Sequence, residues 1–152
     1  MRLKIEINSR EHFSELGYTK NPLEVSSRWW SGEAHVTSFE LDELLATKLR
    51  ALFQRKKGRD LFDLWHAIDQ QLTSPGRIVD CFDRYMSESG ARVTRAMFEE
   101  NVARKLDDPV FRSDMTPLLR PGFSWDIDHA GEVVREELIA LLPGEPWRGH
   151  GA

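Results

Sequence analysis

The feature that most constrains this chain is a change in the spacing of its apolar residues near residue 41. Upstream, apolar and polar residues alternate, as in a strand with one buried face, whereas downstream apolar residues recur every three or four positions, as on a helix. The first helical stripe consists of Leu41, Leu44, Leu45, Leu49 and Leu52. We therefore expect an α+β fold, in which short antiparallel strands are followed by a helical bundle.

The upstream part contains three strand candidates, which are residues 3–8, 23–30 and 34–39. Turn signals at Asn21-Pro22 and Ser31-Gly32 precede the second and third candidates. The three strands are expected to form a small meander.

The downstream part is expected to contain about five helices. Thr37 to Glu40 is a candidate capping box for the first helix, and Gly58 separates it from the second. The apolar face of the second helix consists of Leu61, Leu64, Trp65, Ile68 and Leu72.

Three further helix starts carry capping signals. Ser74-Pro75 begins the third helix and Thr94 caps the fourth. A shorter segment starts at Asp108-Pro109, and Asp126 or Asp128 caps the last helix, which is expected to reach Leu141. The chain thus divides into a partial sheet at 1–40 and a helical region at 41–152, and we expect both to form one compact unit.

Composition excludes several classes of protein. The net charge of −4 argues against a surface that is basic all over, and no apolar run approaches the length needed to cross a membrane. The single cysteine, Cys81, excludes an intrachain disulfide, and the five histidines lack the spacing of a zinc site. A cytoplasmic protein is expected.

Lys48 is a candidate site residue because it lies within the leucine stripe of the first helix. A buried ammonium group is costly unless it meets an anion, such as a phosphate or a carboxylate. The alternative is that the aliphatic stem of Lys48 lies along the edge of the core while its head reaches water.

Asp60 flanks the apolar stripe of the second helix and is the second candidate, whereas Asp63 lies nearly opposite the stripe and is expected to be solvated or ion-paired. The alternative for Asp60 is a structural role, because an aspartate in the first turn stabilises a helix N-terminus.

A basic stretch surrounds these two residues. It is made up of Arg50, Arg55, Lys56, Lys57 and Arg59. Side chains on the connection between two helices could bind the phosphates of a nucleotide or of RNA, or they could simply form a solvated loop.

The other carboxylate side chains of the sequence provide few candidate metal ligands. Glu6, on the polar face of the first strand, could be one metal ligand, although a single residue makes no site. The D-x-D sequence of Asp126 and Asp128 is interpreted as a helix N-terminus.

The segment LDELLATKLRALFQRKKGRDLFDLW resembles the C-terminal half of AbiEii/AbiGii-type nucleotidyltransferase toxins, in which a lysine-bearing helix is followed by a basic turn and an R-D-x-x-D-L helix. The segments LKIEINSREHF and GEAHVTSFELDELL are similar to the strands before that helix. RPGFSWDIDHAGEVV and LLPGEPW look like the usual ending, so the resemblance covers essentially the whole chain.

The resemblance implies a nucleotidyltransferase fold that uses a nucleoside triphosphate with Mg²⁺, a cognate antitoxin as partner and, in some members, tRNA as the acceptor. Lys48 then matches the lysine expected to contact the triphosphate, Asp60 matches the aspartate of the next motif, and Glu6 is a candidate third carboxylate. The G-S turn and D-x-D strand that the family places before the first strand are missing here.

In the family, the carboxylates of the D-x-D strand hold the catalytic metal ions. Because that strand is missing here, we expect a truncated or partial toxin that is inactive alone and needs a separate N-terminal half. The alternatives are a non-enzymatic helical module that binds an antitoxin or RNA, and a chain with no selected function.

Overall fold

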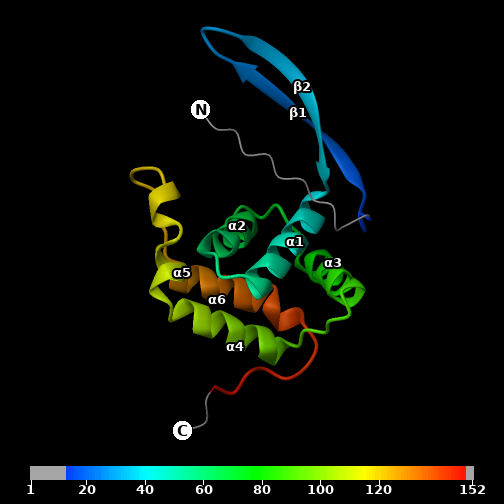
Figure 1. Cartoon of the computed structure of the whole chain (residues 1–152), viewed down its shortest axis with the longest axis vertical. Helices are drawn as coiled ribbons and strands as arrows, with labels where there is room; N and C mark the ends of the chain where they lie inside the picture. Colours follow the sequence, from blue (N-terminus) through cyan, green and yellow to red (C-terminus); the bar gives the residue numbers. More distant parts are fainter. Residues whose placement is uncertain (1–12, 150–152) are drawn as a thin grey trace. The chain divides into compact units, whose positions relative to one another are not determined.

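The computed structural model describes residues 13–149, and the chain divides into two compact units, 1–40 and 41–152 (Figure 1). Within the described residues, two strands are followed by six α-helices and two 3-10 helices, which confirms the α+β prediction. The strand expected at 3–8, together with Glu6, lies outside the described residues.

The first unit contains an antiparallel hairpin of β1 (Tyr18–Ser26) and β2 (Ser31–Phe39), in which Tyr18 pairs with Phe39 and Ser26 with Ser31. The Tyr18 and Phe39 rings stack with their centroids 5.3 Å apart. In the turn, Ser27 N–H donates to the Trp30 carbonyl over 2.9 Å.

The expected strand boundaries were wrong on both sides of this turn. Asn21-Pro22 lies inside β1 and Ser31-Gly32 begins β2, while the turn occupies residues 27–30. Within residues 13–149 the sheet has two strands, so β1 and β2 are both edge strands there and the missing N–H of Pro22 need not break a ladder.

All the helices found in residues 13–149 belong to the second unit. Their bounds are α1 Leu41–Gln54, α2 Gly58–Asp69, α3 Pro75–Glu88, α4 Arg95–Leu106, α5 Pro109–Ser113 and α6 Ile127–Glu137, with 3-10 helices η1 Thr116–Leu118 and η2 Ile139–Leu141. Thr94 caps α4 by accepting from Met97 N–H, and Asp126, rather than Asp128, caps α6. None of the helices in the described part of the chain is both long and apolar enough to traverse a bilayer.

Three expectations about helix ends and faces were wrong. Thr37 is not a cap, because it belongs to β2 and α1 begins at Leu41. The last helix ends at Glu137, and Leu141 is exposed in η2. Leu41 and Leu44 are 40% and 39% exposed, so the buried face of α1 is centred on Leu45, Leu49 and Leu52.

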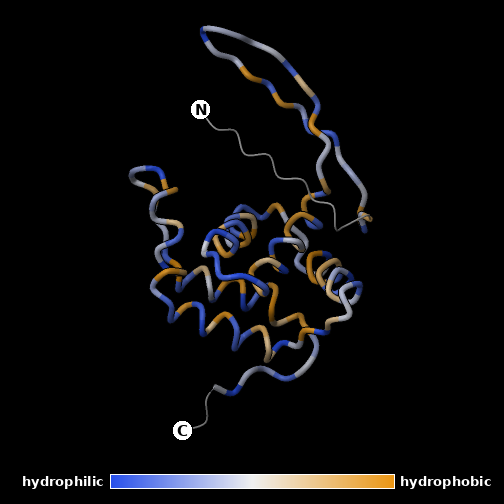
Figure 2. Tube along the Cα trace, viewed as in Figure 1, coloured by the Kyte–Doolittle hydropathy of each residue, from blue (hydrophilic) through white to orange (hydrophobic). Residues whose placement is uncertain are grey.

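The core of this unit lies around α1, which contacts α2, α3 and α4, while α6 packs against α2 and α4. Figure 2 shows hydrophobic residues recurring between hydrophilic ones along these helices, as amphipathic packing requires. The fully buried side chains include Leu49, Leu52, Leu61, Phe82, Phe98, Phe111, Val134 and Leu138. Burial of each such side chain stabilises the fold by roughly 1.5–3 kcal/mol.

Buried polar groups add specific connections between the helices. Asp42, at the start of α1, accepts from Ser74 N–H over 3.0 Å and pairs with Arg77, which joins the beginnings of α1 and α3. Tyr85 on α3 donates its hydroxyl to Glu43 over 2.7 Å in the core. These bonds hold α3 in one register along α1.

Candidate functional site

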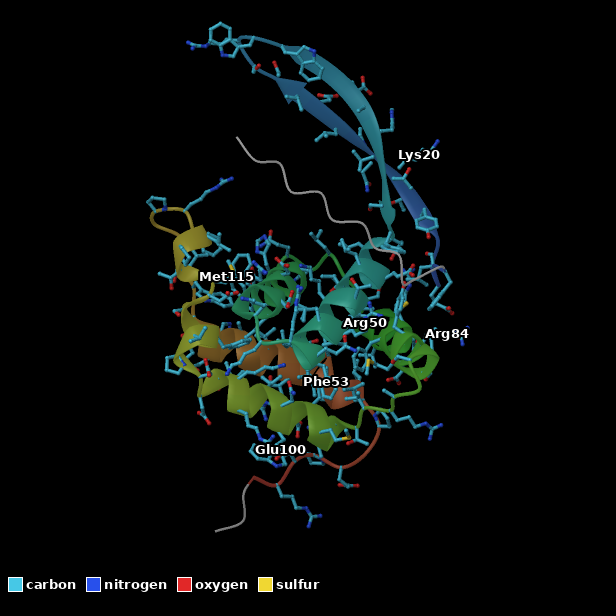
Figure 3. All side chains as sticks on the ribbon, in the orientation of Figure 1. Lys20, Arg50, Phe53, Arg84, Glu100 and Met115 are labelled. Carbon is cyan, nitrogen blue, oxygen red and sulfur yellow. The ribbon has the colours of Figure 1, made fainter. Side chains whose placement is uncertain are left out.

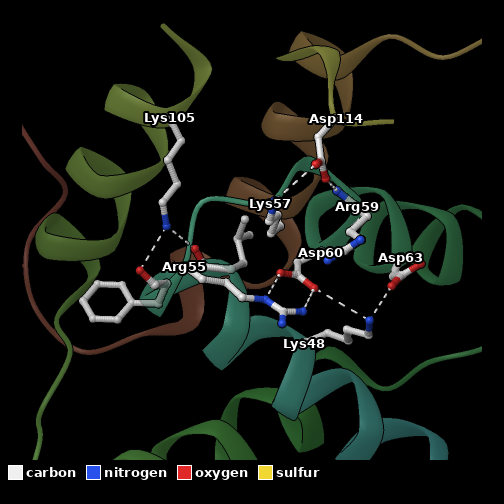
Figure 4. Close-up of polar contacts among 10 residues, drawn as sticks. Lys48, Arg55, Lys57, Arg59, Asp60, Asp63, Lys105 and Asp114 are labelled. Atoms are coloured by element: carbon white, nitrogen blue, oxygen red, sulfur yellow. Dashed lines mark hydrogen bonds and ion pairs between the residues drawn. The ribbon is translucent and has the colours of Figure 1, made fainter. Parts of the chain in front are cut away.

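Asp60 is the centre of the candidate site and is fully buried in the first turn of α2. Both of its oxygens accept hydrogen bonds from Arg55, one from Nε and one from a terminal nitrogen, each over 2.7 Å (Figure 4). This bidentate contact raises the pKa of Arg55. Such fork-shaped pairing fixes the guanidinium group in orientation as well as in position.

Lys48 approaches the same carboxylate from α1. Its Nζ lies 2.7 Å from Asp63 Oδ2 and 3.7 Å from Asp60 Oδ1 (Figure 4). The lysine side chain is 31% exposed, so it lies at the edge of the core rather than on a buried face. Asp63 is ion-paired, as expected.

Helical spacing explains why these residues meet. Lys48 and Arg55 are seven positions apart, and Asp60 and Asp63 are three apart, so each pair projects from one side of its segment. The short connection through Gly58 then brings the two sides together. Gly58 is required there, because a Cβ atom at this position would lie 2.4 Å from the Phe111 carbonyl oxygen.

Two further basic residues of the connection, Lys56 and Lys57, are paired with aspartates. Lys56 pairs with Asp108 and lowers the pKa of that carboxyl group, while Lys57 Nζ lies 3.8 Å from Asp114. Arg59 donates its backbone N–H to Asp114 over 3.3 Å. Within residues 13–149, no ion pair is formed by the Arg59 side chain.

Arg50 does not join this group. Arg50 is labelled in Figure 3. Its guanidinium carbon lies 5.0 Å from the ring centroid of Tyr85 on α3, in a cation–π arrangement. The structure therefore brings together Lys48, Asp60 and Arg55, with Lys57 and Arg59 beside them, but separates Arg50 from the group.

Lys105 is a charged residue of this region that sequence reasoning missed. Its Nζ donates to the carbonyl oxygens of Leu52 and Phe53, the latter over 3.0 Å, and so caps the C-terminal turn of α1 (Figure 4). Burial lowers the pKa of Lys105 to about 8. No local signal could have revealed this contact, because Lys105 and Phe53 are 52 positions apart.

The described carboxylates do not fit a Mg²⁺ site. Asp60 is occupied by Arg55 and Lys48, and residues 13–149 contain no group of three or more His, Cys, Asp or Glu side chains that could hold a metal ion. Asp126 caps α6 and Asp128 pairs with Arg112 over 2.6 and 2.7 Å, which confirms the interpretation of this D-x-D as a helix N-terminus.

The cluster holds two cationic side chains of the protein at its surface. Lys48 and Arg55 remain partly exposed while a buried carboxylate fixes them, which is an arrangement that can present positive charge to an anionic ligand. Phosphate groups are ligands of this kind.

Comparison with known proteins identifies the family. A family model described as nucleotidyl transferase AbiEii toxin, type IV TA system, matches residues 1–133. The searches of curated proteins and of solved structures found no match. Because the family match spans most of the 152 residues, the chain belongs to the AbiEii nucleotidyltransferase toxin family of type IV toxin-antitoxin systems.

Proposed function

We propose that this chain is the phosphate-handling part of a nucleotidyltransferase toxin, in which Lys48 and Arg55 contact the triphosphate of a nucleoside triphosphate. The supporting observation is that the buried Asp60 holds both cations at the edge of the helical unit. Fixed cations stabilise the negative charge that spreads over a phosphoryl group during transfer. The proposed site of action is the cytoplasm, and the proposed partner is a cognate antitoxin.

Asp60 is assigned a positioning role. Its two oxygens already accept from Arg55, so a metal ion could bind there only by displacing the guanidinium group. The residues that contact phosphate are then the cations, and Asp60 acts through them. No catalytic step is assigned to a metal at this cluster.

The chain alone is proposed to be inactive in nucleotidyl transfer, with tRNA as the acceptor once a family N-terminal half supplies the metal-binding carboxylates. The test incubates the full chain, alone and with such an N-terminal half, with labelled nucleoside triphosphates, Mg²⁺ and tRNA. Label should reach tRNA only in the pair. The variant Lys48→Ala should slow that transfer about a hundredfold, a typical loss for one charge-stabilising donor.

The matched control is Arg104→Ala, which removes an exposed cation that pairs with Glu100 outside the cluster. Its transfer rate should equal that of the unchanged chain. Transfer by the isolated chain would contradict the proposed inactivity. Failure of the pair with every nucleotide would contradict the enzymatic role altogether.

A non-enzymatic binding module is the second candidate, and the exposed apolar side chains of the hairpin favour it. Leu23, Trp29 and Trp30 are 51%, 80% and 61% exposed, which is typical of a protein-binding surface. If this role is correct, Lys48→Ala should leave nucleotide binding unchanged. Replacement of Arg55, Lys56 and Lys57 would then abolish any RNA binding in a salt-dependent manner.

A further inference from the structure

A cleft of about 350 Å³ lies between α4 and α6, on parts of the helical unit that the candidate site does not use. Its floor is apolar and is formed by Val102, Ala103, Leu106 and Ile139, and Trp147 from the C-terminal segment lines one side. A volume of this size falls within the range of small-molecule sites. In Figure 1 the two helices lie side by side and the C-terminal segment runs along α4.

The walls of the cleft are held in place by local contacts. Glu99 is buried, and its two oxygens accept from Arg95 Nε over 2.8 Å and from Trp147 N–H over 2.6 Å, which ties the C-terminal segment to α4. Gly131 lets α6 approach α4 closely, because a Cβ atom there would lie 2.9 Å from Leu106 Cδ1. The cleft therefore belongs to the packed part of the unit and not to a loose end.

The charged groups around the cleft leave one carboxylate without a partner. Glu99 pairs with Arg95, Asp128 with Arg112, and Arg135 with the neighbouring Glu136. Glu132 also lines the cleft, and its side chain makes no ion pair or hydrogen bond with any other residue of the described chain. The cleft thus combines an aliphatic floor, an aromatic wall and one uncompensated negative charge.

From this combination we infer that the cleft binds a primary alkylammonium group, either a free aliphatic polyamine or the lysine side chain of a partner protein. The methylene chain would lie on the apolar floor, and the ammonium group would pair with Glu132 beside the Trp147 ring. Anionic ligands are disfavoured by the uncompensated carboxylate of Glu132. This site is independent of the proposed nucleotide chemistry.

The test titrates the full isotope-labelled chain with 1,5-diaminopentane and, separately, with an N-acetyl lysine amide, and follows NMR shifts of the Trp147 indole N–H. Saturable shifts are expected with the diamine, or with both ligands if the site also accepts a lysine side chain. Pentanediol, which has the same chain length and no charge, should bind at least about tenfold more weakly, as expected for the loss of a charge-assisted contact.

Two variants locate the site. Glu132→Gln should weaken diamine binding about tenfold, whereas the control Glu137→Gln, on the same helix but outside the cleft, should not. Ala103→Phe should abolish binding by filling the cleft, and its circular dichroism spectrum would report whether the fold is kept. Absence of saturable shifts with both amines, equal binding of pentanediol, or equal effects of the two glutamate variants would overturn the inference.

Discussion

At the scale of single residues, Asp60 supplies the buried negative charge that balances Arg55 and Lys48 where α1 meets α2. Its buried carboxylate is satisfied by Arg55 and lies 3.7 Å from Lys48 Nζ. Asp60→Asn removes the negative charge and leaves both cations without their shared partner. We expect the free energy of unfolding, measured by urea denaturation, to fall by about 2 kcal/mol, as for other charge-assisted hydrogen bonds.

Asp63→Asn is the control for this prediction. Asp63 also pairs with Lys48, but its side chain is 41% exposed. Exposed ion pairs contribute little, so the expected loss is below about 1 kcal/mol. Equal losses in the two variants would show that the burial of Asp60 does not determine its contribution to the free energy of unfolding.

Gly58 offers a second test at this scale. The β-carbon of an alanine would meet the Phe111 carbonyl at 2.4 Å, and backbone cannot move aside as a flexible side chain can. Gly58→Ala should therefore lower the free energy of unfolding by about 1–3 kcal/mol, as expected for overpacking. Chemical denaturation would measure this loss.

Gly76→Ala is the matched control, because Gly76 also lies in the first turn of a helix and nothing lies within 4 Å of an added Cβ atom. It should leave stability unchanged or raise it by up to about 1 kcal/mol through the higher helix propensity of alanine. Similar effects at both glycines would contradict a steric role for Gly58.

At the scale of the elements, Lys105 joins α4 to the C-terminal end of α1 through the Leu52 and Phe53 carbonyls. Burial lowers its pKa from 10.5 to about 8. Between these two values the unfolded chain binds more protons at this residue than the folded chain does, so stability rises with pH through that window.

The pH prediction is tested with Lys105→Met, which keeps the length of the side chain without a titratable group. The stability of the unchanged chain relative to the variant should increase from pH 8 towards pH 10.5. Denaturation curves recorded across this range measure the difference. A difference that is constant with pH would show that the pKa of Lys105 is not lowered.

Several helix starts could be predicted from the sequence because their signals are local. Thr94 and Asp126 accept hydrogen bonds from N–H groups two or three positions ahead, and Pro75 supplies the φ angle of a first helical turn. The Thr37 to Glu40 pattern failed for a non-local reason. Thr37 pairs with Lys20 across the hairpin, and strand pairing outweighed a local capping signal.

At the scale of the whole molecule, the two units differ in how much of their backbone is protected. In the described part of the chain the sheet consists of two strands with mostly exposed side chains, whereas the helical unit buries a continuous core. Two-stranded sheets are only marginally stable in water. Amide hydrogens of β1 and β2 should therefore exchange quickly, while those around Leu49 and Phe82 should exchange slowly.

Hydrogen-exchange mass spectrometry of the full chain would test this contrast. The amides of α3 serve as the internal control, since its residues Ile78, Phe82 and Tyr85 are buried. Protection of the hairpin equal to that of α3 would contradict the prediction. It would instead indicate that another surface covers the strands.

The sequence by itself determined the α+β class, the helix starts at Ser74-Pro75, Thr94 and Asp126, and the family, because periodicity, caps and motif spacing depend on neighbours along the chain. It also placed Lys48, Asp60 and Asp63 on adjoining helices. Their roles in phosphate handling stay predictions.

Only the tertiary structure decided which charges meet. Lys56 reaches Asp108 across 52 positions, Lys105 caps a helix 52 positions away, and Arg50 turns towards Tyr85 instead of joining the other cations. Such pairings depend on how helices pack, which local spacing does not specify. For this reason the basic connection, for which the sequence allowed either phosphate binding or a solvated loop, is largely neutralised by aspartates of the fold.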